Sequence, residues 1–472
     1  MNKARLVHPG FWFDKNSLQE ALALAKRGVG GFCLYGGTKE QVAAFTAAVR
    51  QASPLKKILI SADYEDGLGR WLPDAPLLPS NMALGAARDE SLAFEKGLFT
   101  ARQARCLGVD WVFAPVVDLA NNPLNPIVNT RAFSAEPAQV ISLARAFIKG
   151  LRQGGALNSL KHFPGHGDTT TDSHLGLPVI RRTLTQLQAR EMVPFQALLN
   201  DADSVMIGHL SLPELDADKP ASLSKKIITD LLRKELHYTG CVVTDALLMK
   251  AIGDEKQASL DALSAGADIL LVPQHPNELI DFLEQTPINE DILTRAEQAQ
   301  DKLCALPEKT KETSSQDFFS THNFVLRAAQ KSIVQTGPEF TLRPGDTVYY
   351  VQVGNSSGVC AEPFLNTLKE HNITAVPFEG QKGPLLVLCF RRYQAFDGSI
   401  GLQQEEKLKL EQLVKNVPHC ACVLFASPWA LGKLTEGRTT IYTFSPSPEF
   451  QQTAAEILLG RQKSNGTLPV AL

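Results

Sequence analysis

Three histidines, two aspartates and a lysine lie within the fourteen residues 161–174, which read Lys-His-Phe-Pro-Gly-His-Gly-Asp-Thr-Thr-Thr-Asp-Ser-His. Lys161 and His162 end a short apolar run, and the glycines, proline and threonines after them predict an irregular, mobile loop. Asp172 stands two residues before His174, so its carboxylate can hold one imidazole nitrogen while the other moves a proton. Because enzymes place much of their chemistry on loops at strand ends, we interpret this segment as part of a catalytic site.

Two further carboxylates end apolar runs elsewhere in the chain. Asp245 follows Val-Val-Thr, and it could act as a nucleophile or an electrostatic partner, or it could cap the helix that follows. Asp63 begins a group of three acids within four residues, with Glu65 and Asp66. Metal binding by this group is conceivable, but solvation of a loop is the commoner explanation, because no matching His or Cys spacing accompanies it. We therefore predict no metal site and no cofactor.

Arg131 and His209 carry weaker signals. Arg131, in Asn-Thr-Arg-Ala-Phe, could clamp a polar ligand with its fork of donors, although a surface arginine is the commoner explanation. His209 follows an apolar run, and taken alone such a histidine is more often part of a core than a ligand contact. A functional role for either residue depends on where the predicted strands and helices place it.

Apolar runs and amphipathic stretches alternate through the first three hundred residues. Eight such pairs predict a (β/α)8 barrel, in which the carboxyl ends of the strands converge on one face, where active sites are found. Asp63, Lys161, His162, His209 and Asp245 all fall at such ends. The predicted strands are 6–8, 31–35, 58–63, 111–117, 157–160, 205–209, 242–245 and 268–272. The predicted helices lie near 17–27, 39–51, 90–107, 138–153, 184–200, 225–236 and 255–265, with a last one within 278–306.

A polar, aperiodic stretch follows residue 306 and is typical of a linker. Beyond it, apolar runs at 348–353, 385–390 and 421–425 alternate with helical patterns, which predicts a smaller α/β sandwich domain. The sequence therefore predicts a catalytic barrel over 1–307, a linker and connecting helix over 308–330, and a second domain over 331–472.

Composition excludes several classes of protein. Of the 472 residues, 44% are hydrophobic and 21% charged, as in a soluble globular protein, and the net charge of −3 gives no electrostatic case for binding nucleic acid. The amino terminus lacks the apolar core of a secretory signal, and no apolar run approaches the ~20 residues of a membrane span. The eight cysteines are scattered, which favours buried thiols in a reducing compartment. We therefore expect a cytoplasmic protein.

Several of these segments together resemble glycoside hydrolase family 3, in particular its β-N-acetylglucosaminidase branch. The Asp-Ser-His element separates this branch from the β-glucosidases of the family, which generally place a glutamate acid in the second domain. The resemblance covers 161–178, with Lys-His-Phe-Pro-Gly-His-Gly-Asp and Asp-Ser-His, and 220–252, with Pro-Ala-Ser-Leu-Ser and Thr-Asp-Ala-Leu-Leu-Met. It also covers 129–134, 206–216, 265–272 and the tail 454–470.

The resemblance implies a role for each matching residue. Asp245 would be the nucleophile and His174 the acid/base, with Asp172 as its orienting partner. One departure concerns the third strand, after which this branch usually reads Asp-x-Glu-Gly-Gly-Arg, whereas residues 63–70 read Asp-Tyr-Glu-Asp-Gly-Leu-Gly-Arg. Arg70 is a plausible occupant of the displaced arginine position. The residues that would bind the sugar in the −1 subsite are Asp63, Arg131, Lys161 and His162, with Arg70 and His209 as further candidates.

The resemblance thus implies a retaining exo-β-N-acetylglucosaminidase that acts on muropeptides or amino-sugar oligosaccharides through a covalent glycosyl-aspartate. A phosphorylase of the same fold is an alternative, because a histidine acid carries no negative charge to repel phosphate. A non-catalytic sugar-binding barrel is a more distant one. The expected partner is a small glycoside, while the aglycone, the oligomeric state, any protein partner and the role of the second domain stay open.

Overall fold

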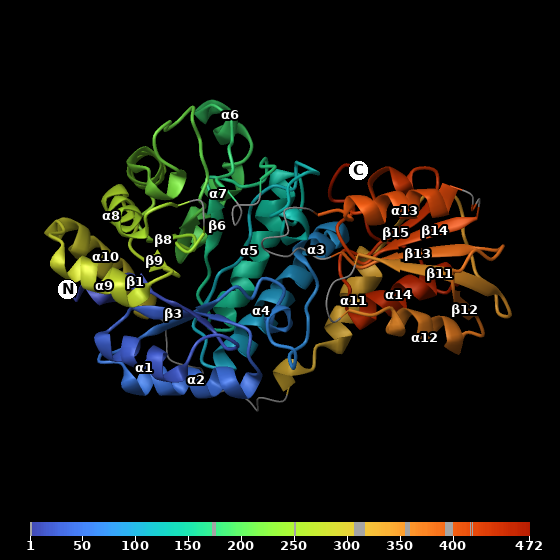
Figure 1. Ribbon diagram of the computed structural model, residues 1–472, viewed down its shortest axis with the longest axis horizontal. Helices are drawn as coiled ribbons and strands as arrows, with labels where there is room; N and C mark the ends of the chain where they lie inside the picture. Colours follow the sequence, from blue (N-terminus) through green and yellow to red (C-terminus); the bar gives the residue numbers. More distant parts are fainter. Residues whose placement is uncertain are drawn as a thin grey trace.

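The computed structural model describes residues 2–171, 176–249, 252–305, 317–354, 359–391, 400–415, 417 and 419–472. Asp172 and His174, two of the predicted catalytic residues, lie outside these ranges. The described residues form a parallel barrel and a six-stranded sheet flanked by helices, which stand side by side in Figure 1. This arrangement confirms the predicted fold class.

Eight parallel strand positions close the barrel. β1 pairs with β9, and isolated bridges from Trp111 to Leu157 and from Val243 to Ile269 join the remaining sheets into a ring. Most strand residues are buried, as expected where the barrel core lies on one side and helices on the other. The strands are β1 (Val7–His8) continued by β2 (Gly10–Trp12), β3 (Gly31–Tyr35), β4 (Leu59–Ala62), β5 (Trp111–Val112), β6 (Leu160–Phe163), β7 (Ser204–Ile207), β8 (Cys241–Thr244) and β9 (Leu270–Leu271).

Helices follow the strands and cover the outside of the ring (Figure 1). Two of them begin with the capping boxes of Ser17 and Thr38, whose hydroxyls accept a backbone N–H of the first turn. The helices are α1 (Leu18–Arg27), α2 (Lys39–Ala52), α3 (Asn81–Ala87), α4 (Glu90–Cys106), α5 (Pro137–Gln153), α6 (Leu184–Ala189), α7 (Val193–Leu198), the π-helix Lys226–Glu235, α8 (Glu255–Ala265), α9 (Pro276–Gln285) and α10 (Glu290–Cys304).

Two predicted helices are divided in the structure. The stretch 184–200 contains α6 and α7, because Pro194 has no N–H to continue a helix and instead begins the second one. The stretch 278–306 contains most of α9 and all of α10, because Pro287 disfavours helix at the residue before it and Asn289 caps the next helix.

The barrel interior is filled by side chains rather than open. Trp111, Phe113 and Met206 belong to this buried core, against which Trp12 and Tyr35 pack while remaining partly exposed. Ala246 and Leu248 share that intermediate position. Because these partly exposed residues stand at or beyond the carboxyl ends of strands, they form the upper layer of the interior, at the mouth of the barrel.

The second sheet is parallel except at one edge. Its order is β10-β15-β14-β13-β11-β12, and only β10 runs antiparallel to its neighbour. The predicted domain boundaries stay a prediction, since residues 306–316 lie outside the described ranges. The strands are β10 (Val334–Thr336), β11 (Thr347–Val353), β12 (Thr374–Pro377), β13 (Leu385–Cys389), β14 (Cys420–Leu424) and β15 (Thr439–Tyr442), and the helices are α11 (His322–Ser332), α12 (Glu362–Glu370), α13 (Gln404–Lys415) and α14 (Pro448–Leu458).

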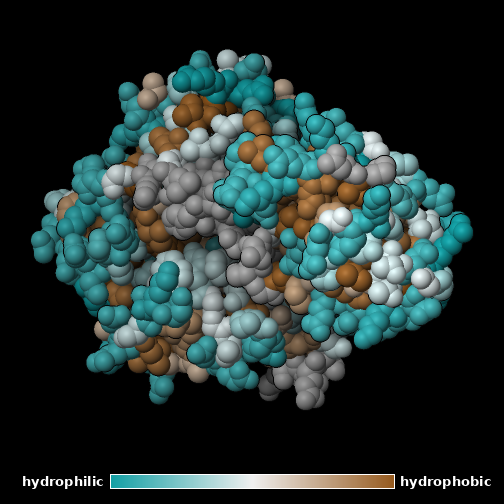
Figure 2. All heavy atoms as spheres, turned by 45° about the vertical axis from the view of Figure 1, so that its right-hand side comes forward, coloured by the Kyte–Doolittle hydropathy of each residue, from teal (hydrophilic) through white to brown (hydrophobic). Residues whose placement is uncertain are grey.

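The carboxyl-terminal segment returns to the barrel. The backbone N–H of Thr467 donates to the carbonyl of Ala86, and the Ser134 hydroxyl donates to the carbonyl of Pro469 at 2.8 Å. Polar side chains cover most of the face seen in Figure 2, with apolar ones in the recesses between them. Among the described residues, no helix combines the length and the apolar character that a membrane span requires.

Candidate active site

Lys161 joins two carboxylates at the mouth of the barrel. It lies on β6, is 1% exposed, and places Nζ 2.7 Å from Oδ1 of Asp63 and 2.6 Å from Oε1 of Glu65. Burial alone would lower the pKa of this ammonium, but the two carboxylates outweigh it and raise the pKa. Lys161 is therefore held as a cation, and Asp63, with 25% of its side chain exposed, keeps oxygen surface for a ligand.

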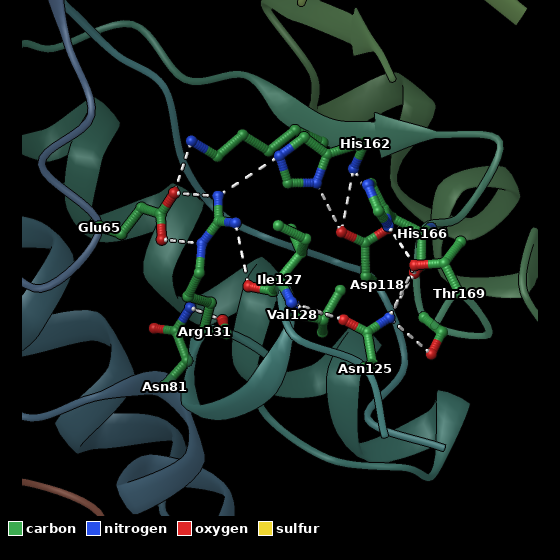
Figure 3. A network of polar contacts seen from close by, with 12 residues as sticks. Glu65, Asn81, Asp118, Asn125, Ile127, Val128, Arg131, His162, His166 and Thr169 are labelled. Carbon is green, nitrogen blue, oxygen red and sulfur yellow. Dashed lines mark hydrogen bonds and ion pairs between the residues drawn. The ribbon is translucent and has the colours of Figure 1, made fainter. Parts of the chain in front are cut away.

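Glu65 and Arg131 form a buried bidentate pair beside this lysine (Figure 3). The guanidinium Nε and Nη2 donate to the two carboxylate oxygens at 2.8 and 2.7 Å. Burial would raise the pKa of Glu65, but the charges of Arg131 and Lys161 hold it well below its usual range. Arg131 is only 7% exposed, so the surface-arginine interpretation is wrong.

His162 links this pair to a second buried carboxylate, Asp118. Its Nε2 lies 3.3 Å from Nη2 of Arg131, and its Nδ1 lies 2.7 Å from Oδ2 of Asp118. Because a guanidinium can only donate, Nε2 of His162 accepts a hydrogen bond from Arg131. Nδ1 therefore carries the ring proton and donates a hydrogen bond to Asp118. Burial would raise the pKa of Asp118, but the neighbouring His162 keeps it lowered. Asp118 thus fixes the orientation and tautomer of His162.

The first half of the predicted mobile loop is buried and hydrogen-bonded. Asp118 also accepts the backbone N–H of His166 at 2.7 Å, and the imidazole Nδ1 of His166 lies 2.9 Å from the hydroxyl of Thr169. Gly167 passes so close to the carbonyl of Leu119 that a Cβ would lie 2.1 Å from that oxygen. Residues 164–169 are therefore packed against the barrel, while Asp172 and His174 lie outside the described ranges.

Asn125 fixes this segment through hydrogen bonds of its side-chain amide (Figure 3). Its amide nitrogen donates to the carbonyl oxygens of His166 and Gly167 and to Oγ1 of Thr169, at 2.8, 3.0 and 3.1 Å. Its amide oxygen accepts the backbone N–H groups of Ile127 and Val128, both at 2.8 Å. One buried side chain therefore ties the loop that follows β6 to the turn that leads into Arg131.

Asp245 stands immediately after β8, half-buried at the mouth. Its backbone N–H donates to the carbonyl of Ile207 at 3.0 Å, and its Oδ1 accepts the N–H of Ala246 at 2.8 Å. Counted around the ring, β4 is the third strand position and β8 the seventh, so Asp63 and Asp245 face each other across the mouth.

His209 lies next to this carboxylate but is completely buried. Its Nε2 lies 3.1 Å from the carbonyl oxygen of Ala246, and its Nδ1 lies 2.7 Å from the hydroxyl of Ser222. Because a carbonyl can only accept, Nε2 donates and Nδ1 accepts the hydroxyl proton. Both ring nitrogens are used within the protein, and His209 supports the backbone that carries Asp245. A direct sugar contact by His209 stays a prediction.

Arg70 lies farther out, toward the second sheet. Its Nη1 is 3.7 Å from Oδ2 of Asp66, whose other oxygen is 3.1 Å from the buried Nζ of Lys96. Arg70 lines a small pocket together with Arg391 and Phe444 of the carboxyl-terminal part. The role predicted for Arg70 in sugar binding is still a prediction.

The structure thus gathers Asp63, Lys161, Arg131 and His162 into one network, with Asp245 across the mouth. Sequence reasoning did not identify Glu65, Asp118 and Asn125 as parts of this network. Asp118 had a usable signal, because it immediately follows the predicted strand 111–117. Within the described ranges, no cluster of three or more His, Cys, Asp or Glu side chains could hold a metal ion.

Comparisons with known proteins show the family of the chain. The family described as "Glycosyl hydrolase family 3 N terminal domain" matches residues 3–302. This chain belongs to glycoside hydrolase family 3. A β-hexosaminidase of Xylella fastidiosa is 36% identical over 281 residues, which are 57% of this chain and 82% of that protein. β-Hexosaminidase A of Pseudoalteromonas piscicida is 31% identical over 312 residues, and the chain spans only 52% of its length.

Solved structures extend the similarity to the carboxyl-terminal part. A family 3 β-N-acetylglucosaminidase from Paenibacillus sp. has a TM-score of 0.85 and 26% identity, and the match covers 100% of this chain and 98% of that one. A β-glucoside phosphorylase has a TM-score of 0.88 and 24% identity, and the match covers 100% of this chain and 93% of that one. At this identity the similarity shows a common fold alone. The chain is a glycoside hydrolase with the two-part architecture of these structures.

Proposed function

We propose that this chain is a retaining exo-β-N-acetylglucosaminidase. The observation that carries the proposal is the strand order that puts Asp63 and Asp245 on opposite sides of the mouth, with the ammonium of Lys161 paired to Asp63. Arg131 is linked to the same lysine through Glu65. A sugar held by its hydroxyls at Asp63 would present its anomeric carbon toward Asp245. Relatives named β-hexosaminidase and β-N-acetylglucosaminidase support N-acetyl-β-glucosamine as that sugar.

The proposed reaction has two displacements. A carboxylate oxygen of Asp245 bonds to the anomeric carbon as the glycosidic bond breaks, and the departing oxygen takes a proton from His174. A water molecule then gives its proton to His174 and its oxygen to the anomeric carbon, which releases the sugar and restores Asp245. Asp172 would orient His174 and favour its protonated form.

The charged network explains how the sugar would be held. Lys161 and Arg131 are buried cations whose carboxylate partners fix them in place, so they donate to sugar hydroxyls without reorganising. His162 is fixed in the same way by Asp118. We further propose that the substrates are muropeptides or other amino-sugar oligosaccharides in the cytoplasm.

The decisive assay compares 4-nitrophenyl N-acetyl-β-glucosaminide with 4-nitrophenyl β-glucoside, with and without inorganic phosphate. The proposal expects turnover of the first substrate, much less of the second, and no dependence on phosphate. Formation of a sugar 1-phosphate would show that the chain is a phosphorylase. Failure to turn over either substrate would favour the remaining alternative, a non-catalytic sugar-binding protein.

The acid role of His174 is tested by the leaving group. His174→Ala should slow cleavage of a sugar leaving group by ~10²–10⁴-fold, because such a group needs a proton to depart. A dinitrophenyl leaving group departs without one, and its first step should be much less affected. Equal losses for both substrates would assign His174 to binding instead.

A further inference from the structure

An aromatic wall, formed by Trp12, Tyr35 and Trp71, lines part of the barrel mouth. The rings of Trp12 and Tyr35 are stacked, with centroids 4.6 Å apart and an interplanar angle of 10°. Trp71 meets Tyr35 edge-on, at 5.2 Å and 73°. All three rings are only partly buried, unlike Trp111, which is fully enclosed in the same barrel.

The sequence places each ring at the mouth. Trp12 and Tyr35 are the last residues of β2 and β3, and Trp71 follows the turn after β4. Gly10 permits this arrangement, because a Cβ there would lie 2.5 Å from the indole of Trp12. Two of the three rings are therefore built into strand ends, and Trp71 joins them from the loop after β4.

The wall adjoins both carboxylates of the proposed site. The indole N–H of Trp71 donates to the backbone carbonyl of Asp63 at 3.0 Å. Burial raises the pKa of the Tyr35 phenol well above its usual value, and the negative charges of Asp63 and Asp245 raise it further. Tyr35 thus lies within electrostatic reach of both carboxylates that face each other across the mouth.

The order of strands places Trp12, one end of the wall, across from the hydrogen-bond donors. The strand position formed by β1 and β2 is the first around the ring and β6 is the fifth, so Trp12 lies opposite Lys161 and His162. A ligand held between Asp63 and Asp245 would have cationic donors on one side and apolar rings on the other.

We propose that the wall of Trp12, Tyr35 and Trp71 is a sugar-stacking surface of the −1 subsite. In N-acetyl-β-glucosamine the ring substituents are equatorial, so the C–H bonds point to the two faces. Those hydrogens are polarised by the attached oxygens, and they fit the negative face of an aromatic ring. The proposal rests on the proposed function and adds the groups that would recognise the apolar part of the sugar.

The first test separates the ring of Tyr35 from its hydroxyl. The dissociation constant of N-acetylglucosamine is measured by calorimetry, which needs no turnover. Tyr35→Ala should raise it by about ten-fold, whereas Tyr35→Phe, the matched control, should stay within about two-fold of the wild type. A folded Tyr35→Ala protein with wild-type affinity would overturn the proposal.

The second test uses conservative changes, so it does not depend on the folding of an alanine variant. Trp12 and Trp71 are two of only four tryptophans, and Trp429 lies far along the chain, bonded to the carbonyl of Ala471. N-acetylglucosamine should change the tryptophan emission of the wild type and of Trp429→Phe, but not that of the Trp12→Phe/Trp71→Phe double variant. An undiminished change in the double variant would contradict the wall. Failure of the proposed function would show separately, as wild-type protein that does not hydrolyse the aryl substrate.

Discussion

The two ends of the barrel carry aspartates in opposite circumstances. At the amino ends of the strands, Asp268 is completely buried, is 2.6 and 2.9 Å from nitrogens of Arg233 and Arg295, and accepts the N–H of Val242 at 2.8 Å. At the carboxyl ends, Asp63 is a quarter exposed and has one ammonium partner. The lower carboxylate is fully engaged by the fold, whereas the upper one keeps capacity for a ligand.

Asp110 repeats the lower pattern. It is paired with both Arg50 and Arg105 and accepts the backbone N–H of Ile60 on the neighbouring strand. Two arginines and a strand amide are thus the common surroundings of these lower carboxylates. The same residue type is held by arginines at one end of the barrel and is partly exposed at the other, so the comparison predicts which property each substitution will change.

The largest expected effect is on catalysis at the upper end. Asp245→Ala should lower kcat by ~10⁴-fold or more, because the covalent intermediate cannot form without the carboxylate. Thermal unfolding should be close to that of the wild type, since Asp245 stands half-buried at the mouth of the barrel rather than inside its core. Hydrolysis of the aryl substrate and circular dichroism check both parts, and wild-type-like turnover would mean that the nucleophile is another residue.

The mirror experiment removes a carboxylate at the lower end. Asp268→Asn should lower the free energy of unfolding by about 3–5 kcal/mol, because it leaves Arg233 and Arg295 without their shared charge. Turnover per folded molecule should be unchanged. Urea unfolding and active-site titration measure the two quantities, and a loss of kcat without a loss of stability would break the comparison.

A third effect appears as the pH falls. Burial lowers the pKa of His166 from 6.5 to about 4, so between these values the unfolded chain binds a proton that the folded protein does not. The contribution of neutral His166 to the free energy of unfolding is fully present above pH 6.5. It should fall by up to about 3 kcal/mol toward pH 4. His8, whose pKa burial lowers to about 3, adds a second loss in this window. Unfolding curves should therefore show a shallower pH slope for His166→Gln, and an unchanged slope would contradict the assignment.

The smallest expected effect tests positioning at the upper end. Asp118→Asn should reduce kcat/KM by about 10–100-fold, mainly through KM, because an amide nitrogen facing Nδ1 would reverse the tautomer of His162. Nε2 would then carry a proton toward Arg131, which can only donate. The kcat/KM of Asp118→Glu should lie between that of the wild type and that of Asp118→Asn. Equal values for all three proteins would show that Asp118 has no part in the site.

Local patterns predicted the elements better than the partners. The strand Gly31–Tyr35 and the helix Glu255–Ala265 have the bounds that the sequence predicted, because their apolar periodicity and flanking signals are contained within the element. The strand predicted over 157–160 lies at Leu160–Phe163, so Lys161 and His162 are members of the strand and do not follow it. Buried charges inside a strand oppose the pattern on which such predictions rest.

The site was predictable only as far as each residue carried its own signal. Asp63, Lys161 and His162 lie at the ends of predicted strands, and the structure brings them together. Glu65 lies 66 residues from its partner Arg131, and no spacing rule reports such a pair. Asn125 had no signal, because its role depends on two backbone segments meeting in space.

One contact between the barrel and the carboxyl-terminal segment has a consequence for biosynthesis. The carbonyl of Pro469 accepts from the Ser134 hydroxyl and from the N–H of Ala135, although Ser134 leaves the ribosome 335 residues earlier. While the second sheet is still being translated, Ser134 and Ala135 lack these two hydrogen bonds to Pro469. A nascent barrel can close its ring of strands, but the surroundings of Arg131 are completed only after translation has passed the second sheet.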